Sequence, residues 1–409
     1  MAEERVRLDQ GGTRFRVFPQ PARFGFEAVT VHVEPAPGVI AAGPSDAIVE
    51  TIDAVNKFGY HRDEDESVRR RPPYEGRRRP PLRPNADGHF EFEPGTPEFS
   101  VASPFAIIHT VLRVWRHYLE RPLRWDFADT ARPRLELIPH IRSYNAWSGD
   151  GALEFGYPDF PERLTNPFCE NFEVVAHETG HLIMKSVIGT LPDDEKSLQH
   201  RAHEEAAADL IALLSVLQFD SVVDRVLADT DGCLFGANLL SRIGEWGVTK
   251  SEVERTLFND ATMAWARRRK QLNKHALSLP FSGAVYDLLV EVFKERLVGR
   301  KVLMREVADR YRHRLGRPVP DLGAAFRRAR RDAPAEFREA LLGARDEVAR
   351  LLARAWRSTP RDGVTFASVA GRLLQAAEGA DAAAAGQWTR AAIVTEVFGA
   401  RGITPTRPA

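Results

Sequence analysis

The sequence has only two cysteines, Cys169 and Cys233, in 409 residues. Two thiols cannot build the disulfide framework of a small secreted domain, and this pair lacks the CxxC spacing of a structural zinc site. We therefore expect both to be ordinary core thiols.

Net charge is also absent, because 57 lysines and arginines balance 57 aspartates and glutamates. No overall basic field favours nucleic acid or an acidic membrane surface as a partner. An uninterrupted apolar stretch of about 18 residues is missing too, and the N-terminus, MAEERVRLDQGG, lacks the apolar run of a signal peptide. We expect no nucleic-acid partner, no membrane segment and a cytoplasmic location.

With 43% hydrophobic residues the chain can bury a sizeable core, and its length suggests two or three globular units. Short β-rich segments separated by proline and glycine lie at 14–18, 28–34 and 47–55, a helix is expected over 104–119, and 134–157 reads as strand, turn and strand. From residue 171 the spacing predicts helices over 171–188, 202–219, 221–228, 236–245, 250–273, 281–297, 301–315, 320–331, 334–357, 365–377 and 382–398. The expected fold class is α+β.

Residues 61–98 have a different composition, in which an acidic run precedes two copies of Arg-Arg-Arg-Pro-Pro. Proline interrupts both helices and central strands. We expect a solvated, extended loop that lacks packing; the alternative is a docking site for a partner.

The segment AHETGH, residues 176–181, has two histidines four residues apart and a glutamate directly after the first. On a helix, His177 and His181 lie one turn apart on the same face and can direct two imidazoles at one metal ion. Glu178 is rotated away from that face and can reach a water on the ion without being a ligand. The alternative is a solvated or core helix that carries these three residues by chance.

A catalytic zinc site usually takes three protein ligands and leaves one position open. Downstream, Glu205 and Asp209 stand four residues apart near the start of an otherwise apolar helix. Buried carboxylates need a positive partner or hydrogen-bond donors. Zinc would serve Glu205 and a histidine N–H would serve Asp209; the alternative is that both acids only solvate the helix start, where the dipole favours negative charge.

The neighbouring Glu204 is a competing ligand. A helix turns about 100° per residue, so Glu204 and Glu205 cannot face one ion equally well. Glu205 shares its face with Asp209, whereas Glu204 shares its face with Ala208. Glu205 is therefore the expected ligand.

These segments together resemble the thermolysin-like metallopeptidases, the gluzincin group in which a glutamate from a second helix completes the zinc site. HETGH resembles that family's HExxH helix, and EAAAD resembles its ExxxD helix. The resemblance implies one zinc ion per chain bound by His177, His181 and Glu205, with Glu178 as general base and Asp209 orienting His177.

Two further segments carry the resemblance. YNAWSGDGALEFGY resembles the family's edge strand, which implies that Asn145 and Ala146 hold the substrate backbone with Trp147 nearby. PFSGAVYDLL resembles the Ser-Gly that opens the helix behind the active site, and His275 precedes it. In that family a histidine there donates to the developing oxyanion, which implies a catalytic role for His275.

The chain also departs from the family pattern. The family has a tyrosine soon after the HExxH helix, and this sequence has none between His181 and Glu205. The candidate oxyanion donors are His275, Tyr286 and His203, and each can equally be an ordinary surface or core polar residue.

The resemblance implies a thermolysin-like α+β fold, with a β-containing N-terminal lobe, a mainly helical C-terminal lobe and the zinc-site cleft between them. We expect a β-rich region at 1–98, a peptidase core at 99–300 and a helical region at 301–409. The implied function is a zinc-dependent metalloendopeptidase acting on peptides or proteins. Two alternatives stay open: a non-catalytic or weakly active zinc scaffold that binds peptides or a partner protein, and a gluzincin aminopeptidase.

Overall fold

A computed structural model describes residues 5–60, 72–130, 133–149, 151–243, 255–309, 320–382 and 389–407. The chain divides into two compact units. Unit 1 comprises Met1–His117, Pro122–Ser186 and Trp246–Val253, and unit 2 comprises Tyr118–Arg121, Val187–Glu245 and Glu254–Ala409. Unit 1 holds the larger sheet and unit 2 is mainly helical, which confirms the α+β fold class.

Unit 1 begins with an antiparallel pair of strands, β1 (Thr13–Val17) and β2 (Val29–Val33). Alternate residues of β1 are buried, as in a strand with one face on the core. The Phe15 ring stacks on those of Phe90 and Phe105. Both strands lie where the alternation of apolar residues predicted them.

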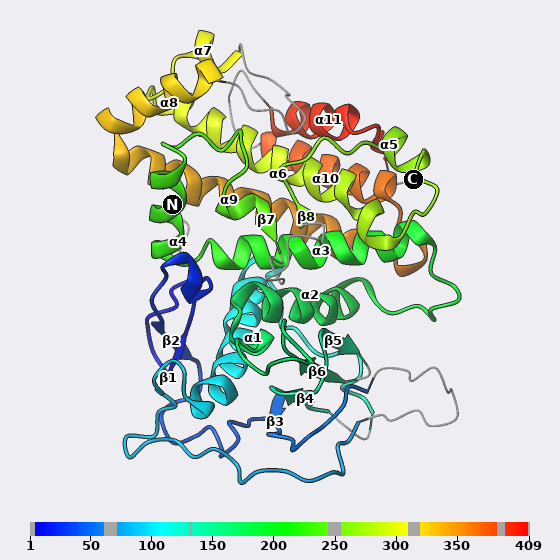
Figure 1. The fold of residues 1–409 in the computed structure, drawn as a ribbon. Coiled ribbons are helices and arrows are strands. Elements are labelled where there is room, and N and C mark those ends of the chain that lie inside the picture. Colours follow the sequence, from blue (N-terminus) through cyan, green and yellow to red (C-terminus); the bar gives the residue numbers. More distant parts are fainter. Residues whose placement is uncertain are drawn as a thin grey trace. The chain divides into compact units, whose positions relative to one another are not determined.

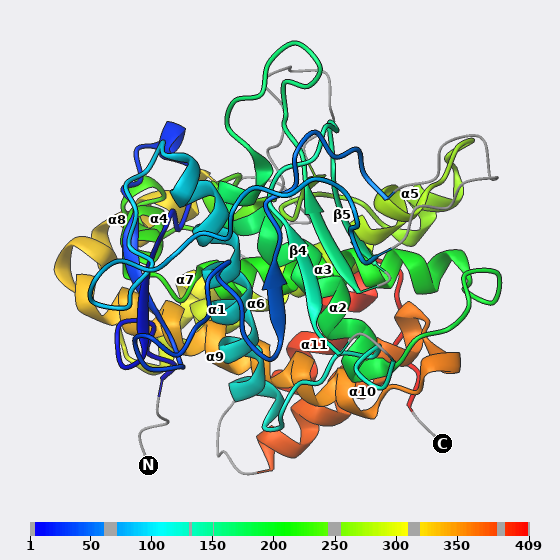
Figure 2. The ribbon, with the colours of Figure 1, turned by 90° about the horizontal axis from the view of Figure 1, so that it is seen from below.

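The larger sheet of unit 1 has the order β3 (Val49–Thr51), β4 (Leu135–Ile138), β6 (Ala152–Phe155) and β5 (Ala146–Gly149). Strands β3 and β6 each run parallel to β4, and β5 runs antiparallel to β6. Every residue of β4 and β6 is buried, as expected for strands covered on both faces. Strand β5 comes last in the strand order and so forms an edge of this sheet. Figure 2 shows β4 and β5.

Two long helices complete unit 1. Helix α1 (Pro97–Leu119) covers the expected 104–119 and begins earlier, because the Thr96 hydroxyl accepts a hydrogen bond from the Phe99 N–H (3.2 Å) and Pro97 suits the first helical position. Helix α2 (Phe172–Ile188) lies where it was expected. The last residues of both helices belong to unit 2.

The Arg/Pro-rich segment is described from residue 72 and is anchored to unit 1. The Val55 N–H donates to the Arg77 carbonyl and the Arg79 N–H to the Asp53 carbonyl, both at 2.8 Å. The Tyr74 ring packs against a cluster of buried apolar side chains, namely Ile52, Ala54, Ile138 and Ile141. The arginine side chains are exposed as expected, but the expectation that the loop lacks packing is wrong for this part. An extended, proline-rich backbone can still pair through its other amides and carbonyls, and the preceding residues 61–71 lie outside the described residues.

Unit 2 is built mainly of helices (Figure 1). They are α3 (Leu198–Val216), α4 (Asp220–Asp229), α5 (Met263–Arg267), α6 (Lys274–Gly299), α7 (Arg305–Asp309), α8 (Pro320–Asp332), α9 (Pro334–Ser358), α10 (Phe366–Asp381) and α11 (Arg390–Ala400).

Four expected helices are wrong or shorter than expected. Within 236–245, Asn238 caps a single turn, η3 (Leu239–Ser241), which passes directly into the short strand β7 (Arg242–Ile243). Within 250–273 the described residues form β8 (Arg255–Thr256) and α5. The helices expected over 301–315 and 382–398 correspond, within the described residues, to α7 and to α11, which starts where the Thr389 hydroxyl caps it. Side-chain caps from Asn238, Thr262 and Thr389 set the starts of η3, α5 and α11 against the apolar spacing.

Helix α6 is the core helix of unit 2 and packs against α3, α9 and α11. It is long and apolar enough to cross a membrane, but 83% of its most apolar window is buried within the fold, as in the core helix of a globular unit. Because α6 contacts α3 as well as α9 and α11, these helices share one core.

The C-terminal segment is fixed to α6 by a buried ion pair. The fully buried Arg401 guanidinium donates to Asp287 Oδ2 (2.7 Å), to Asn259 Oδ1 (2.6 Å) and to the Ala261 carbonyl (3.0 Å). Burial raises the pKa of Asp287 to about 6, and the guanidinium opposes that rise.

Replacing Arg401 by methionine should destabilise the protein by about 3–5 kcal/mol, because Asp287 is then left buried without its cation. Urea unfolding measures the change. Arg407→Met is the matched control, since Arg407 pairs with Glu378 at the surface, and it should change stability by less than about 1 kcal/mol. Equal effects of the two substitutions would contradict the role assigned to Arg401.

Candidate metal centre

His177 and His181 lie one turn apart on α2, with ring centroids separated by 4.8 Å and ring planes at 90°. Asn171 fixes the start of the helix, because its Oδ1 accepts a hydrogen bond from the Glu173 N–H (3.0 Å). His177 is buried and His181 is half-buried. Both imidazoles thus come from one face of a well-capped helix, as the spacing predicted.

Two buried glutamates on α2 have different surroundings. Glu173 lies in the first turn and accepts a hydrogen bond from Gln20 Nε2 (2.7 Å), so it ties α2 to the N-terminal segment of unit 1. Glu178 directly follows His177 and is 7% exposed. Of these two acids, Glu178 is the one placed beside the histidine pair along the helix.

Helix α3 carries the second group of predicted residues. The Ser197 hydroxyl caps it by accepting from the His200 N–H (3.1 Å). Glu205 and Asp209 follow one turn apart, and they are 2% and 1% exposed. Alanines and leucines occupy most of the surrounding helix positions, so burying these two carboxylates requires specific polar partners.

The adjacent acids Glu204 and Glu205 have separate partners within unit 2. Glu204 pairs with Lys196 (3.0 Å) and lies 3.7 Å from His200 Nε2. Glu205 Oε1 lies 2.8 Å from Lys274 Nζ, and its Oε2 lies 3.1 Å from His275 Nδ1. The expected difference in helix face between the two acids is therefore present.

The predicted substrate-binding residues lie on the edge strand of unit 1. Asn145 precedes β5, and its Oδ1 accepts from the Ala146 N–H (2.9 Å). Trp147 packs against the cluster of Ile52, Ala54, Ile138 and Ile141. Within the described residues no strand pairs with the outer edge of β5, so an extended chain could add there.

No family model and no curated protein matches this sequence. Among solved structures, the chain is similar to the precursor of protealysin, a metalloproteinase from Serratia proteamaculans. The two share 13% sequence identity, the similarity covers 98% of this chain and 91% of that chain, and the TM-score is 0.46.

The three candidate oxyanion donors have different environments. The buried Tyr286 hydroxyl accepts from Asn238 Nδ2 (2.7 Å) and donates to the Leu234 carbonyl (3.2 Å). His203 Nε2 accepts from Trp356 Nε1 (3.3 Å), and burial lowers the pKa of His203 to about 3. Both residues serve the core of unit 2. His275 is half exposed, and its Nδ1 lies 3.1 Å from Glu205 Oε2.

Lys274 is a site residue that the sequence reasoning missed. It occupies the first position of α6 after the Asn273 cap, where a cation is unfavourable to the helix dipole. A lysine there, directly before His275, was a signal that an acidic partner lies close by. That partner is Glu205.

Proposed function

We propose that this protein is a zinc-dependent metalloendopeptidase. The observation that carries the proposal is the polar face of α2, where His177 and His181 lie one turn apart and the buried Glu178 directly follows the first. A structural metal site has no use for a buried base beside its ligand. This arrangement therefore favours hydrolysis over a purely structural role.

We assign His177, His181 and Glu205 as the ligands of one zinc ion per chain. Each offers one ligand atom, and two imidazoles with one carboxylate suit zinc, which keeps a fourth position open in catalytic sites. When bound, zinc supplies a Lewis acid that polarises a carbonyl and makes water more acidic.

We assign Glu178 as the general base that transfers protons during the reaction. Its carboxylate accepts a proton from the attacking water and later delivers it to the leaving amine. The side chain is held on a helix and is nearly excluded from solvent, so few competing donors reach it.

Asp209 and His275 are assigned supporting roles. Asp209 lies one turn beyond Glu205 and is as deeply buried, and we propose that it accepts the N–H of His177 and fixes its tautomer. His275 is half exposed beside Glu205, and we propose that it donates to the oxygen of the substrate carbonyl as charge develops there.

The proposed substrate is a peptide or protein held in extended form along β5, where Asn145 and Ala146 present the backbone and the packing of Trp147 fixes the strand. We propose an endopeptidase rather than an aminopeptidase, because Asn145 and Ala146 resemble an edge strand that holds the backbone of an extended substrate. We further propose that it acts in the cytoplasm.

The protein should cleave internal bonds in a peptide library, lose this activity on chelation and regain it with added zinc. Mass spectrometry of the products, with and without N-terminal acetylation, measures the outcome. Cleavage of acetylated peptides identifies an endopeptidase, whereas cleavage confined to free N-termini identifies the aminopeptidase alternative. Zinc binding without any cleavage identifies the scaffold alternative.

A further inference from the structure

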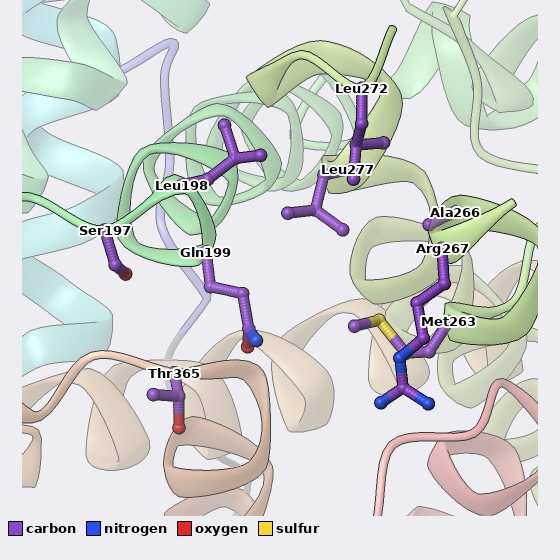
Figure 3. Close-up of a pocket in the computed structure, with 9 residues that line it drawn as sticks. All are labelled: Ser197, Leu198, Gln199, Met263, Ala266, Arg267, Leu272, Leu277 and Thr365. Carbon is purple, nitrogen blue, oxygen red and sulfur yellow. The ribbon is translucent and has the colours of Figure 1, made fainter. Parts of the chain in front are cut away.

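Unit 2 contains a cavity of about 440 Å³ that none of the proposed site residues lines (Figure 3). It lies at the start of α3, beside α5 and the first turn of α6. The lining residues are Ser197, Leu198, Gln199, Met263, Ala266, Arg267, Leu272, Leu277 and Thr365. A cavity of this size is in the usual range for small-molecule sites.

The cavity lining is mainly apolar, and its polar groups lie away from the three leucines. Figure 3 shows Leu198, Leu272 and Leu277 together at one end, and the Arg267 guanidinium and the Thr365 hydroxyl toward the other. Leu198 is 40% exposed although it opens a helix of the unit core. Exposed leucine beside a hollow is a surface that an apolar ligand group can cover.

Three polar side chains that line the cavity already accept a hydrogen bond from the backbone. The hydroxyls of Ser197 and Thr365 accept from helix N–H groups as caps. Gln199 Oε1 accepts from the Phe366 N–H (3.2 Å). Two hydroxyl protons and the Gln199 amide N–H groups remain as donors to a ligand, and each oxygen keeps a second lone pair.

The only charge on the lining is positive. Arg267 has no ion-pair partner among the described residues, and it begins an exposed basic run that continues through Arg268, Arg269 and Lys270. No acidic side chain lines the cavity. A ligand that matches this lining carries an anionic acceptor at one end and an apolar body at the other.

We propose that this cavity binds a free aliphatic monocarboxylate. The carboxylate lies against the Arg267 guanidinium with the Gln199 amide beside it, and the tail covers the leucines and Met263. Apart from Leu272, the lining residues belong to helices or their caps, and none belongs to a strand on whose edge an extended peptide could pair. This inference is independent of the proposed peptidase activity.

Calorimetry with octanoate as the probe tests the proposal. Arg267→Met should weaken octanoate binding by at least about tenfold, because a charge-assisted hydrogen bond is lost. Arg268→Met is the matched control, since Arg268 is the next residue of the same basic run and does not line the cavity, and it should bind octanoate like the unmodified protein.

One further variant tests the apolar part of the lining, and one further ligand tests the class of molecule that binds. Leu198→Glu, an exposed position where glutamate suits the helix start, should abolish binding without loss of fold by circular dichroism. N-acetyl-leucyl-leucine, which imitates a peptide C-terminus, should bind more weakly than octanoate. Three results would overturn the proposal: no octanoate binding at millimolar concentrations, equal binding by the two arginine variants, or tighter binding of the peptide acid.

Discussion

Glu178→Gln is expected to lower peptide cleavage by about 10²- to 10⁴-fold while zinc stays bound. Glutamine keeps the size of the side chain and an acceptor oxygen, but it cannot take up a proton near neutral pH. The residue binds no metal in the proposed mechanism, so its substitution should leave the zinc content unchanged. Single-turnover cleavage and metal analysis of the same preparation measure both quantities.

Glu173→Gln is the matched control for that substitution. Glu173 is a second buried acid on α2, one helical turn before His177, and its carboxylate is used by Gln20. Its amide variant should therefore keep most of the activity. Cleavage by Glu178→Gln at the rate of the Glu173→Gln variant would remove Glu178 from the mechanism.

Glu205→Ala is expected to lower zinc affinity by about 100-fold or more, while Glu204→Ala leaves it nearly unchanged. Loss of a residue that only supports a ligand already costs about 10- to 100-fold, and loss of a ligand should exceed that. Glu204 instead pairs with Lys196 and lies near His200. Asp209→Ala should fall between the two, because it removes only the proposed partner of His177.

The elements that the sequence predicted well are those in which burial and helical spacing coincide. Helix α9 (Pro334–Ser358) matches the expected 334–357, because its apolar stripe is long and a proline marks its first turn. The failures lie where short-range polar contacts decide the backbone. Asn238 closes a one-turn capping box inside a segment whose composition alone is helical. Such contacts depend on the rotamer of one side chain, which spacing does not encode.

The candidate site was predictable within each helix but not between segments far apart in the sequence. The helical repeat alone placed His177 and His181 on one face of α2, and it placed Glu204 and Glu205 on different faces of α3. It could not show that Lys274 reaches Glu205, because that contact joins residues almost seventy positions apart. Nor could it show that Tyr286 is bound by Asn238 and thus serves the core.

Competitive zinc titration against a chelator, run on the unmodified protein beside Glu205→Ala and Glu204→Ala, tests the central claim most directly. The proposed site requires one tightly bound zinc per chain in the unmodified protein and in Glu204→Ala, and a severe loss of affinity in Glu205→Ala. Absence of zinc from the unmodified protein after dialysis against the metal, or the greater loss in Glu204→Ala, would contradict it.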